Sequence, residues 1–256
     1  MVINNNNLVK DSCLFYSFTN NLVSTQDICE LAVVLKKENP KYLFLKLSEG
    51  SIEITDLEIL RLQNVLNDSA SSMVYSDFRS ISEDSKISEL ECIDYQVGSV
   101  RDDFDFGHLV AINASIALKA IEDLKNEQNY QFACWYQLRL ALSLYALPYH
   151  LNEYLYTYIE KNEKKDSQFD YVNPRNRSVQ IEFEQVFTSF LKKFGAWTDY
   201  TNMKSATALD SNSKVVASVV IPVYNRVKTI RDAVTSALSQ ECHFPYNVIE
   251  IGRAHV

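Results

Sequence analysis

The sequence contains few residues that interrupt regular structure. Its 256 residues include only five glycines and five prolines, which excludes a low-complexity or loop-dominated chain. No stretch approaches the ~18 consecutive apolar residues of a membrane-spanning helix, and the first residues lack the basic and apolar segments of a signal peptide. We therefore expect a globular protein with long, mostly helical elements.

Basic charge and paired cysteines are also scarce. The net charge is −8, with 25 Lys and Arg against 33 Asp and Glu, whereas a nucleic-acid-binding surface is basic. The five cysteines contain no Cys-x-x-Cys pair, which is typical of reduced, mostly buried thiols. We predict a cytoplasmic protein that does not bind nucleic acid, and we leave peripheral association with the inner face of the membrane open.

Residues 1–160 are predicted to form an α/β domain. Apolar runs at 14–18, 42–47 and 73–78 predict strands, and capped helical patterns that begin at Thr25 and Thr55 lie between them. This alternation favours a sheet with parallel strands. Helical periodicity over 109–124 and 135–145 predicts helices that cover the sheet, and a tyrosine-rich segment at 151–160 follows.

The rest of the chain divides into three parts. Residues 161–213 are predicted to be a linker that contains one helix, over 179–194, with an aromatic stripe typical of core packing. Residues 214–249 predict a strand, a polar turn, a helix and a second strand, which is one βαβ unit. Ligands of such sheets bind just beyond the carboxyl ends of the strands.

The segment SVVIPVYNRVKTIRDAVTSALSQ (218–240) resembles the opening of family 2 glycosyltransferases of the GT-A type. In that family the turn after the first strand lies against the uracil and ribose of a nucleotide-sugar donor. The resemblance therefore implies that Pro222, Tyr224, Asn225 and Arg226 bind the donor nucleotide. Their chemistry agrees, because an aromatic ring at a strand end offers a stacking surface and Asn and Arg bond polar groups. A Rossmann-like sheet of another function can begin in the same way.

In the family, this opening is followed by a metal-binding motif and a catalytic base that are absent here. Its members carry an Asp-x-Asp that holds Mg²⁺ or Mn²⁺ against the donor diphosphate and, later, a carboxylate base; neither follows Ile249. The last residues, EIGRAHV, match the translation of a common sequencing-library adapter. We therefore expect residues 250–256 to be read-through, and we expect the fragment to be inactive.

The first domain has a weaker resemblance to the later part of the same fold. The matching segments, in order, are KYLFLKLSEGSIEITDLEILRLQNVL, MVYSDF, VRDDFDFGHLVAINAS, WYQLRLALSLY and LNEYLYTYIEK. The resemblance implies a GT-A-like mixed sheet with helical cover. Where the family has metal-binding aspartates, however, this chain has Lys46 and Ser48, and an ammonium cannot ligate a cation. The base position falls at Phe132 and Ala133, which cannot accept a proton.

Several other polar residues have two interpretations. Asp102, Asp103 and Asp105 beside His108 form either a metal site or, more commonly in an acidic protein, a solvated loop. Acids near strand ends (Glu49, Glu53 and Asp77) could act as stray catalytic groups. His150 and His243 have no partner at a ligand-like spacing. The tyrosines of 154–158 form either a sugar-stacking surface or ordinary packing.

Two functions therefore remain open. The first is a glycosyltransferase that transfers a sugar from a nucleotide-diphosphate donor to a glycan or polysaccharide acceptor, with a degenerate first domain. The second is a noncatalytic pseudo-glycosyltransferase that binds or scaffolds.

Overall fold

The chain forms two compact units, Met1–Trp197 and Thr198–Val256, named unit 1 and unit 2. This computed structural model describes residues 1–3, 7–18, 22–82, 84–160, 177–199, 201, 215–223 and 226–252. The helix predicted within the linker belongs to unit 1. Most of the remaining predicted linker lies outside the described residues.

Unit 1 is built on a mixed sheet. Its strands are β1 (Val2–Ile3), β2 (Leu8–Lys10), β3 (Cys13–Ser17), β4 (Tyr42–Lys46), β5 (Ser51–Glu53), β6 (Met73–Ile81), β7 (Ile87–Leu90), β8 (Leu109–Asn113) and β9 (Tyr149–Ile159). The strands lie in the order β1-β5-β9-β6-β8-β4-β3-β2, and β7 pairs with β6. The predicted α/β class with a mixed sheet is confirmed.

Five strands of this sheet, β1, β3, β4, β6 and β9, run in the same direction. β3 is parallel to β4 and β6 is parallel to β9, while β8 is antiparallel to both β4 and β6. The carboxyl ends of β3, β4, β6 and β9 therefore meet at one edge, together with the amino end of β8. In open α/β sheets this edge is where ligands bind.

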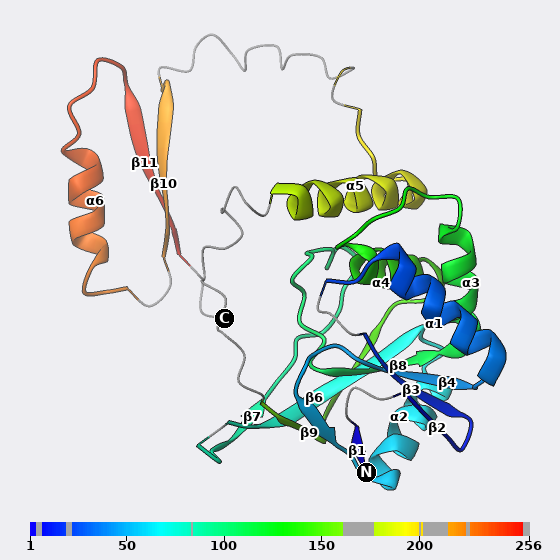
Figure 1. The fold of residues 1–256 in the computed structure, drawn as a ribbon. Coiled ribbons are helices and arrows are strands. Elements are labelled where there is room, and N and C mark those ends of the chain that lie inside the picture. The colour runs from blue at the N-terminus through cyan, green and yellow to red at the C-terminus, as the bar shows by residue number, and fades with distance from the viewer. Residues whose placement is uncertain are drawn as a thin grey trace. The chain divides into compact units, whose positions relative to one another are not determined.

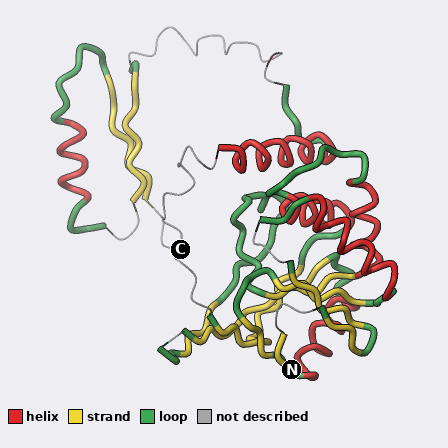
Figure 2. The backbone as a smooth tube through the Cα atoms, in the orientation of Figure 1, coloured by secondary structure: helices red, strands yellow, loops and turns green. Residues whose placement is uncertain are grey.

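Helices cover both faces of the sheet. The helices of unit 1 are α1 (Thr25–Glu38), α2 (Asp56–Asp68), α3 (Ala114–Leu124), α4 (Cys134–Tyr145) and α5 (Arg177–Phe194). Figures 1 and 2 show α2 on one face and α1, α3 and α4 on the opposite face. α5 packs on α4 through its aromatic stripe, in which Val186 and Phe190 are buried, as the sequence predicted.

Local signals explain where α1 and α2 begin. Ser24 and Asp27 form a capping box at the start of α1, and Thr55 and Glu58 form another at the start of α2. Each box satisfies two backbone N–H groups that a helix leaves free. The predicted cap at Thr55 is confirmed, while Thr25 is the first residue of α1 rather than its cap.

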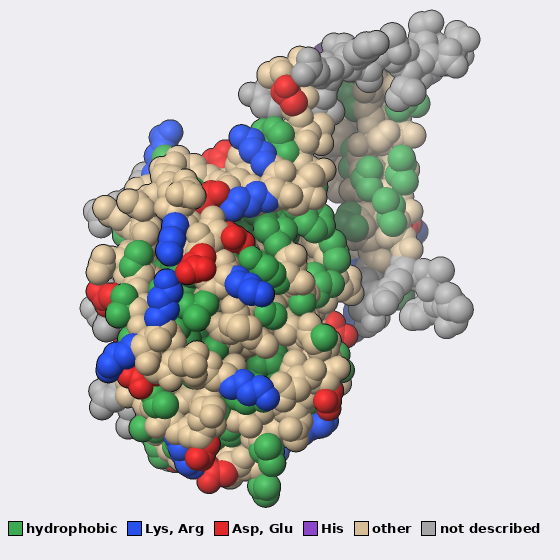
Figure 3. Space-filling view, turned by 90° about the vertical axis from the view of Figure 1, so that its right-hand side faces the viewer, with side chains coloured by type: hydrophobic (Ala, Val, Ile, Leu, Met, Phe, Trp, Pro, Cys, Tyr) green, Lys and Arg blue, Asp and Glu red, His purple; other side chains and the backbone are tan. Residues whose placement is uncertain are grey.

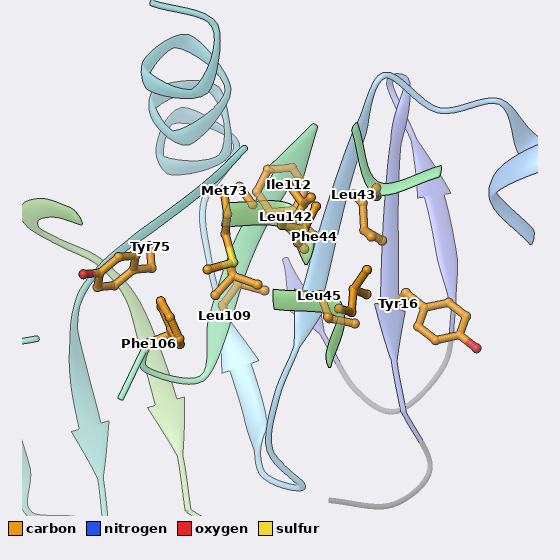
Figure 4. Packing of buried hydrophobic residues seen from close by; sticks show 14 of the residues in the cluster. Tyr16, Leu43, Phe44, Leu45, Met73, Tyr75, Phe106, Leu109, Ile112 and Leu142 are labelled. Carbon is orange, nitrogen blue, oxygen red and sulfur yellow. The ribbon is translucent and has the colours of Figure 1, made fainter. Parts of the chain in front are cut away.

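The centre of the sheet corrects one sequence prediction. Residues 109–113 were expected to begin a helix, but they form β8, the strand between β4 and β6. Val110 and Ile112 are fully buried, and a strand buried on both faces is a continuous apolar run without the alternation that marks other strands. Figure 4 shows Ile112 and Leu109 packed among Met73 and Leu142 in this core.

Unit 2 contains the predicted βαβ arrangement. β10 (Ala217–Val223) and β11 (Tyr246–Gly252) pair in parallel, and α6 (Ile230–Leu238) connects them. Residues 250–252, which were expected to be read-through, continue β11. No residue of α6 is buried, and Val220 and Ile251 are 50% and 55% exposed. Two parallel strands alone cannot cover their apolar side chains.

Candidate functional site

Lys46 lies at the carboxyl end of β4, at the edge of the sheet where α/β proteins bind ligands. Its side chain is buried, with 1% of the residue exposed. The ammonium donates a hydrogen bond of 2.5 Å to the backbone carbonyl of Ser48, while Ser48 Oγ is buried and has no hydrogen-bond partner among the described residues. A buried lysine side chain, which offers no carboxylate oxygen, therefore already stands at this position.

This arrangement does not fit a divalent metal ion. Mg²⁺ and Mn²⁺ are held by carboxylate oxygens, and here an ammonium occupies the strand end and repels a second cation. Among the described residues, no group of three or more His, Cys, Asp or Glu side chains could hold a metal ion. No chemical step through a metal at Lys46 and Ser48 can be derived from these residues.

His108 immediately precedes β8, the strand that pairs with β4, and so lies next to Lys46. Its backbone carbonyl accepts a hydrogen bond from the N–H of Leu47 at 2.9 Å, and its ring stacks on Tyr158 with 3.5 Å between the ring centres. Burial lowers the pKa of His108 to about 4, and the charge of Lys46 adds to this effect. The ring is therefore neutral at neutral pH and serves as a packing surface.

Gly107 makes this position of His108 possible. Its φ of 71° lies in the left-handed region, and a side-chain carbon there would collide with the hydroxyl of Tyr156. That hydroxyl accepts a hydrogen bond from the N–H of His108 at 2.6 Å. Only glycine combines the backbone conformation with the close contact.

The described structure does not gather the acidic residues beside His108 into a metal site, which was the less favoured of their two interpretations. Asp103 pairs with the guanidinium of Arg101, and Asp105 accepts the N–H of Gly107 at 2.8 Å. The ring of His108 instead faces Phe78 and Tyr158, and Asp102 is exposed. Glu49 and Glu53 are also exposed, so the described structure groups none of these acids into a site.

Phe132 and Ala133 lie just before α4, as predicted, and a carboxylate from another element lies beside them. Glu182 of α5 accepts hydrogen bonds from the backbone N–H groups of Gln131 at 2.9 Å and Phe132 at 2.7 Å. Ala133, the N-cap of α4, provides no side-chain cap of its own. Glu182 thus holds the backbone just before α4 from another helix, a contact that a local sequence pattern cannot show.

The structure also pairs His150, for which no partner was predicted from residue spacing. Its two ring nitrogens lie 2.8 Å from Asp77 Oδ1 and 2.8 Å from Asp94 Oδ1. Asp77 is 73 residues away in the chain, so only the parallel pairing of β6 with β9 brings the two together. Asp77 is buried against this ring and is no stray acid at the sheet edge.

The donor-binding candidates lie in unit 2. Pro222 is exposed near the carboxyl end of β10, opposite Ile251 of β11. Arg226 is exposed, and its carbonyl accepts the N–H groups of Thr229 and Ile230 at the start of α6. Tyr224 and Asn225 lie outside the described residues. The structure therefore positions two of the four candidates, on either side of the turn after β10.

The surface shows no concentration of charge of one sign on the face in Figure 3, where Lys and Arg side chains are interspersed with Asp and Glu. Among the described residues, no helix is both long enough and apolar enough to cross a bilayer.

Comparison with protein-family models and with curated proteins gives no match to this chain.

Proposed function

We propose that the protein belongs to a system that transfers a sugar from a nucleotide-diphosphate donor to a glycan or polysaccharide acceptor. In this proposal unit 2 is the opening of a family 2 glycosyltransferase domain. Unit 1 is a degenerate, noncatalytic relative that scaffolds that domain or holds the acceptor. An intact catalytic domain would use Mg²⁺ or Mn²⁺, for which unit 1 offers no site at Lys46.

The observation that supports a role for unit 2 is the geometry around the turn after β10. Pro222 and Arg226 flank a turn at the carboxyl end of a strand in a parallel βαβ unit, and nucleotides bind at such turns in α/β sheets. The segment resembles the donor-binding turn in its residues as well as in its place.

The observation that supports a noncatalytic unit 1 is the buried ammonium of Lys46. A lysine that is 1% exposed and bonded to the carbonyl of Ser48 replaces the acidic ligands that bind the diphosphate-bound metal in the family. The alternative function, a binding or scaffolding module without any transferase domain, is favoured by this same residue.

The genomic sequence downstream of the codon for Ile249 separates these two functions. We expect an Asp-x-Asp motif after a third predicted strand, as the family pattern requires. An open reading frame that continues without such a motif would contradict the transferase and leave the binding module.

An activity measurement on the present chain tests the inactivity of unit 1. The chain is incubated with uridine-diphosphate sugars and Mn²⁺, and released uridine diphosphate is measured against the same mixture without protein. We expect equal release in both. Turnover that depends on Mn²⁺ and stops on addition of EDTA would refute a noncatalytic unit 1.

A further inference from the structure

Unit 1 contains an apolar cavity of about 140 Å³ between three of its segments. These are residues 91–108, which connect β7 to β8, the end of α4, and the last turns of α5. Phe190 of α5 is buried in the core, whereas Leu147, which follows α4, and Phe194 are 43% and 49% exposed. The cavity therefore reaches from the core to solvent, and its mouth is apolar.

Aromatic packing holds the wall that the connection between β7 and β8 contributes. The ring centre of Tyr95 lies 5.3 Å from that of Phe104 and 5.9 Å from that of Phe106. Farther along, the carbonyl of Val100 accepts a hydrogen bond from the hydroxyl of Tyr136 at 2.5 Å. Because this wall is anchored at two places, the cavity is already formed without a ligand, as is usual for small-molecule sites.

The hydroxyl groups of the lining belong to Tyr95 and Ser143, and a buried guanidinium lies close to them. Arg139 is one helical turn before Ser143 on the same face of α4. The ring of Phe106 packs on Tyr95 and lies 5.4 Å from the guanidinium carbon of Arg139. Burial raises the pKa of Tyr95, and the charge of Arg139 opposes that shift. The positive charge therefore acts at this end of the cavity.

Among the described residues, no carboxylate pairs with Arg139. The residue is 2% exposed, one of its nitrogens donates to the carbonyl of Arg101, and Nη1 has no hydrogen-bond partner. The carboxylates whose charges act on it, Asp102 and Asp103, are exposed, and Asp103 pairs with Arg101. A buried charge destabilises a fold unless it is paired. An anion bound beside Arg139 would supply the counter-charge that these residues do not.

We propose that this cavity binds a small aromatic carboxylate. An apolar cavity of about 150 Å³ holds a benzene ring, and aromatic rings pack favourably against side chains such as Phe190 and Phe194. The carboxylate accepts hydrogen bonds from the hydroxyls of Tyr95 and Ser143, and Arg139 provides the opposite charge. This site lies outside the proposed donor site in unit 2 and does not depend on sugar transfer.

Titration of the isotope-labelled full chain with 3-phenylpropionate, followed by amide chemical shifts, tests the site. We expect saturable shifts at Val97, Gly98 and Ser143. The neutral analogue 3-phenylpropan-1-ol carries the same ring on a chain of the same length. It should bind about tenfold more weakly, the factor expected when a hydrogen bond loses its charge. Equal affinities for the two compounds, or no saturable shift with the acid, would overturn the proposal.

A substitution at the mouth tests whether the ligand enters the cavity. Val97 lines the cavity and is 63% exposed, so Val97→Trp places a large ring at the mouth without burying it in the core. The affinity for 3-phenylpropionate should fall about tenfold, because the ligand ring loses apolar burial. Val33→Trp, at a position of α1 that is 65% exposed, is the matched control and should bind like the unaltered chain. Equal affinities of the two variants would place the ligand elsewhere and refute the site.

A second pair of variants tests the role of the charge. Arg139→Met keeps an apolar side chain of similar length at the buried position and should bind the acid no more tightly than the alcohol. Lys119→Met removes a positive charge from the exposed side of α3 and should keep the tenfold preference for the acid. Circular dichroism confirms that each variant is folded. A folded Arg139→Met variant that still prefers the acid would contradict the proposal.

Discussion

Lys46, His108 and Asp77 are polar side chains that the fold of unit 1 buries, and each is accommodated differently. The ammonium of Lys46 bonds a backbone carbonyl, the ring of His108 stays neutral between aromatic rings, and Asp77 pairs with His150. Buried polar groups destabilise a fold unless they are bonded or neutral. Each of these three buried groups therefore has a hydrogen-bond partner or an aromatic surface against it.

His108 should make the protein less stable in acid. Burial lowers its pKa from 6.5 to about 4, so between these values the unfolded chain binds a proton that the folded chain does not. Stability that is present at neutral pH is thus lost as the pH falls. Between pH 7 and about pH 4.5, protonation at His108 should lower the free energy of unfolding by about 2 kcal/mol.

The variant His108→Phe isolates this contribution, because phenylalanine keeps the stacking on Tyr158 and cannot bind a proton. Urea unfolding at the two pH values gives the free energy of unfolding of each protein. We expect the variant to lose about 2 kcal/mol less than the unaltered chain in acid. Equal losses in both proteins would show that His108 is accessible to protons in the fold.

Cys92 should resist alkylation. Burial raises the pKa of its thiol to about 12, and the thiolate is the form that reacts. At pH 8, iodoacetamide should modify the exposed cysteines Cys29 and Cys242 and leave Cys92 unmodified until urea is added. Mass spectrometry of the peptides measures this, and equal labelling of Cys92 and Cys29 in the folded chain would contradict the burial.

At the scale of elements, α5 packs on α4 through apolar side chains and is held to the segment between α3 and α4 by two carboxylates. Glu182 bonds the N–H groups of Gln131 and Phe132, and Glu127 bonds Lys193 and Ser189 at the other end of the contact. These bonds complement the buried side chains of Val186 and Phe190. α5 is therefore part of unit 1 rather than a linker element.

Glu182→Ala should loosen this contact. It leaves two backbone N–H groups without their acceptor and removes an anion from the start of α4, which should lower the free energy of unfolding by about 1–2 kcal/mol. Glu184→Ala on the exposed side of the same helix is the control, with an expected change within about 0.5 kcal/mol. Urea unfolding gives both values, and equal effects of the two substitutions would exclude a stabilising role of the Glu182 hydrogen bonds.

Local patterns in the sequence predicted most elements but few of the contacts between them. The capped start of α2 at Thr55 and the strand that ends at Lys46 follow from neighbouring residues. The residues 109–113 form β8 because tertiary burial on both faces prevails over their helical pattern. The pairs His150–Asp77 and Glu182–Phe132 join residues 73 and 50 positions apart, and no local spacing encodes such pairs.

At the scale of the whole molecule, the two units contribute different parts of the proposed function. Unit 1 has a large mixed sheet with a buried core and a buried lysine, Lys46, at the carboxyl end of β4. Unit 2 has the parallel βαβ framework and the flanks of a turn that resembles a donor-binding turn. The central claim of this account is that unit 1 cannot bind a nucleotide diphosphate through a divalent metal ion.

Paramagnetic broadening by Mn²⁺ tests this claim most directly. Amide signals of residues 46–50 and of His108 are recorded in the full chain with Mn²⁺, with and without uridine diphosphate. We predict no selective loss of these signals, because the ammonium of Lys46 occupies the strand end. Selective broadening at 46–50 that uridine diphosphate strengthens and excess Mg²⁺ reverses would contradict the account.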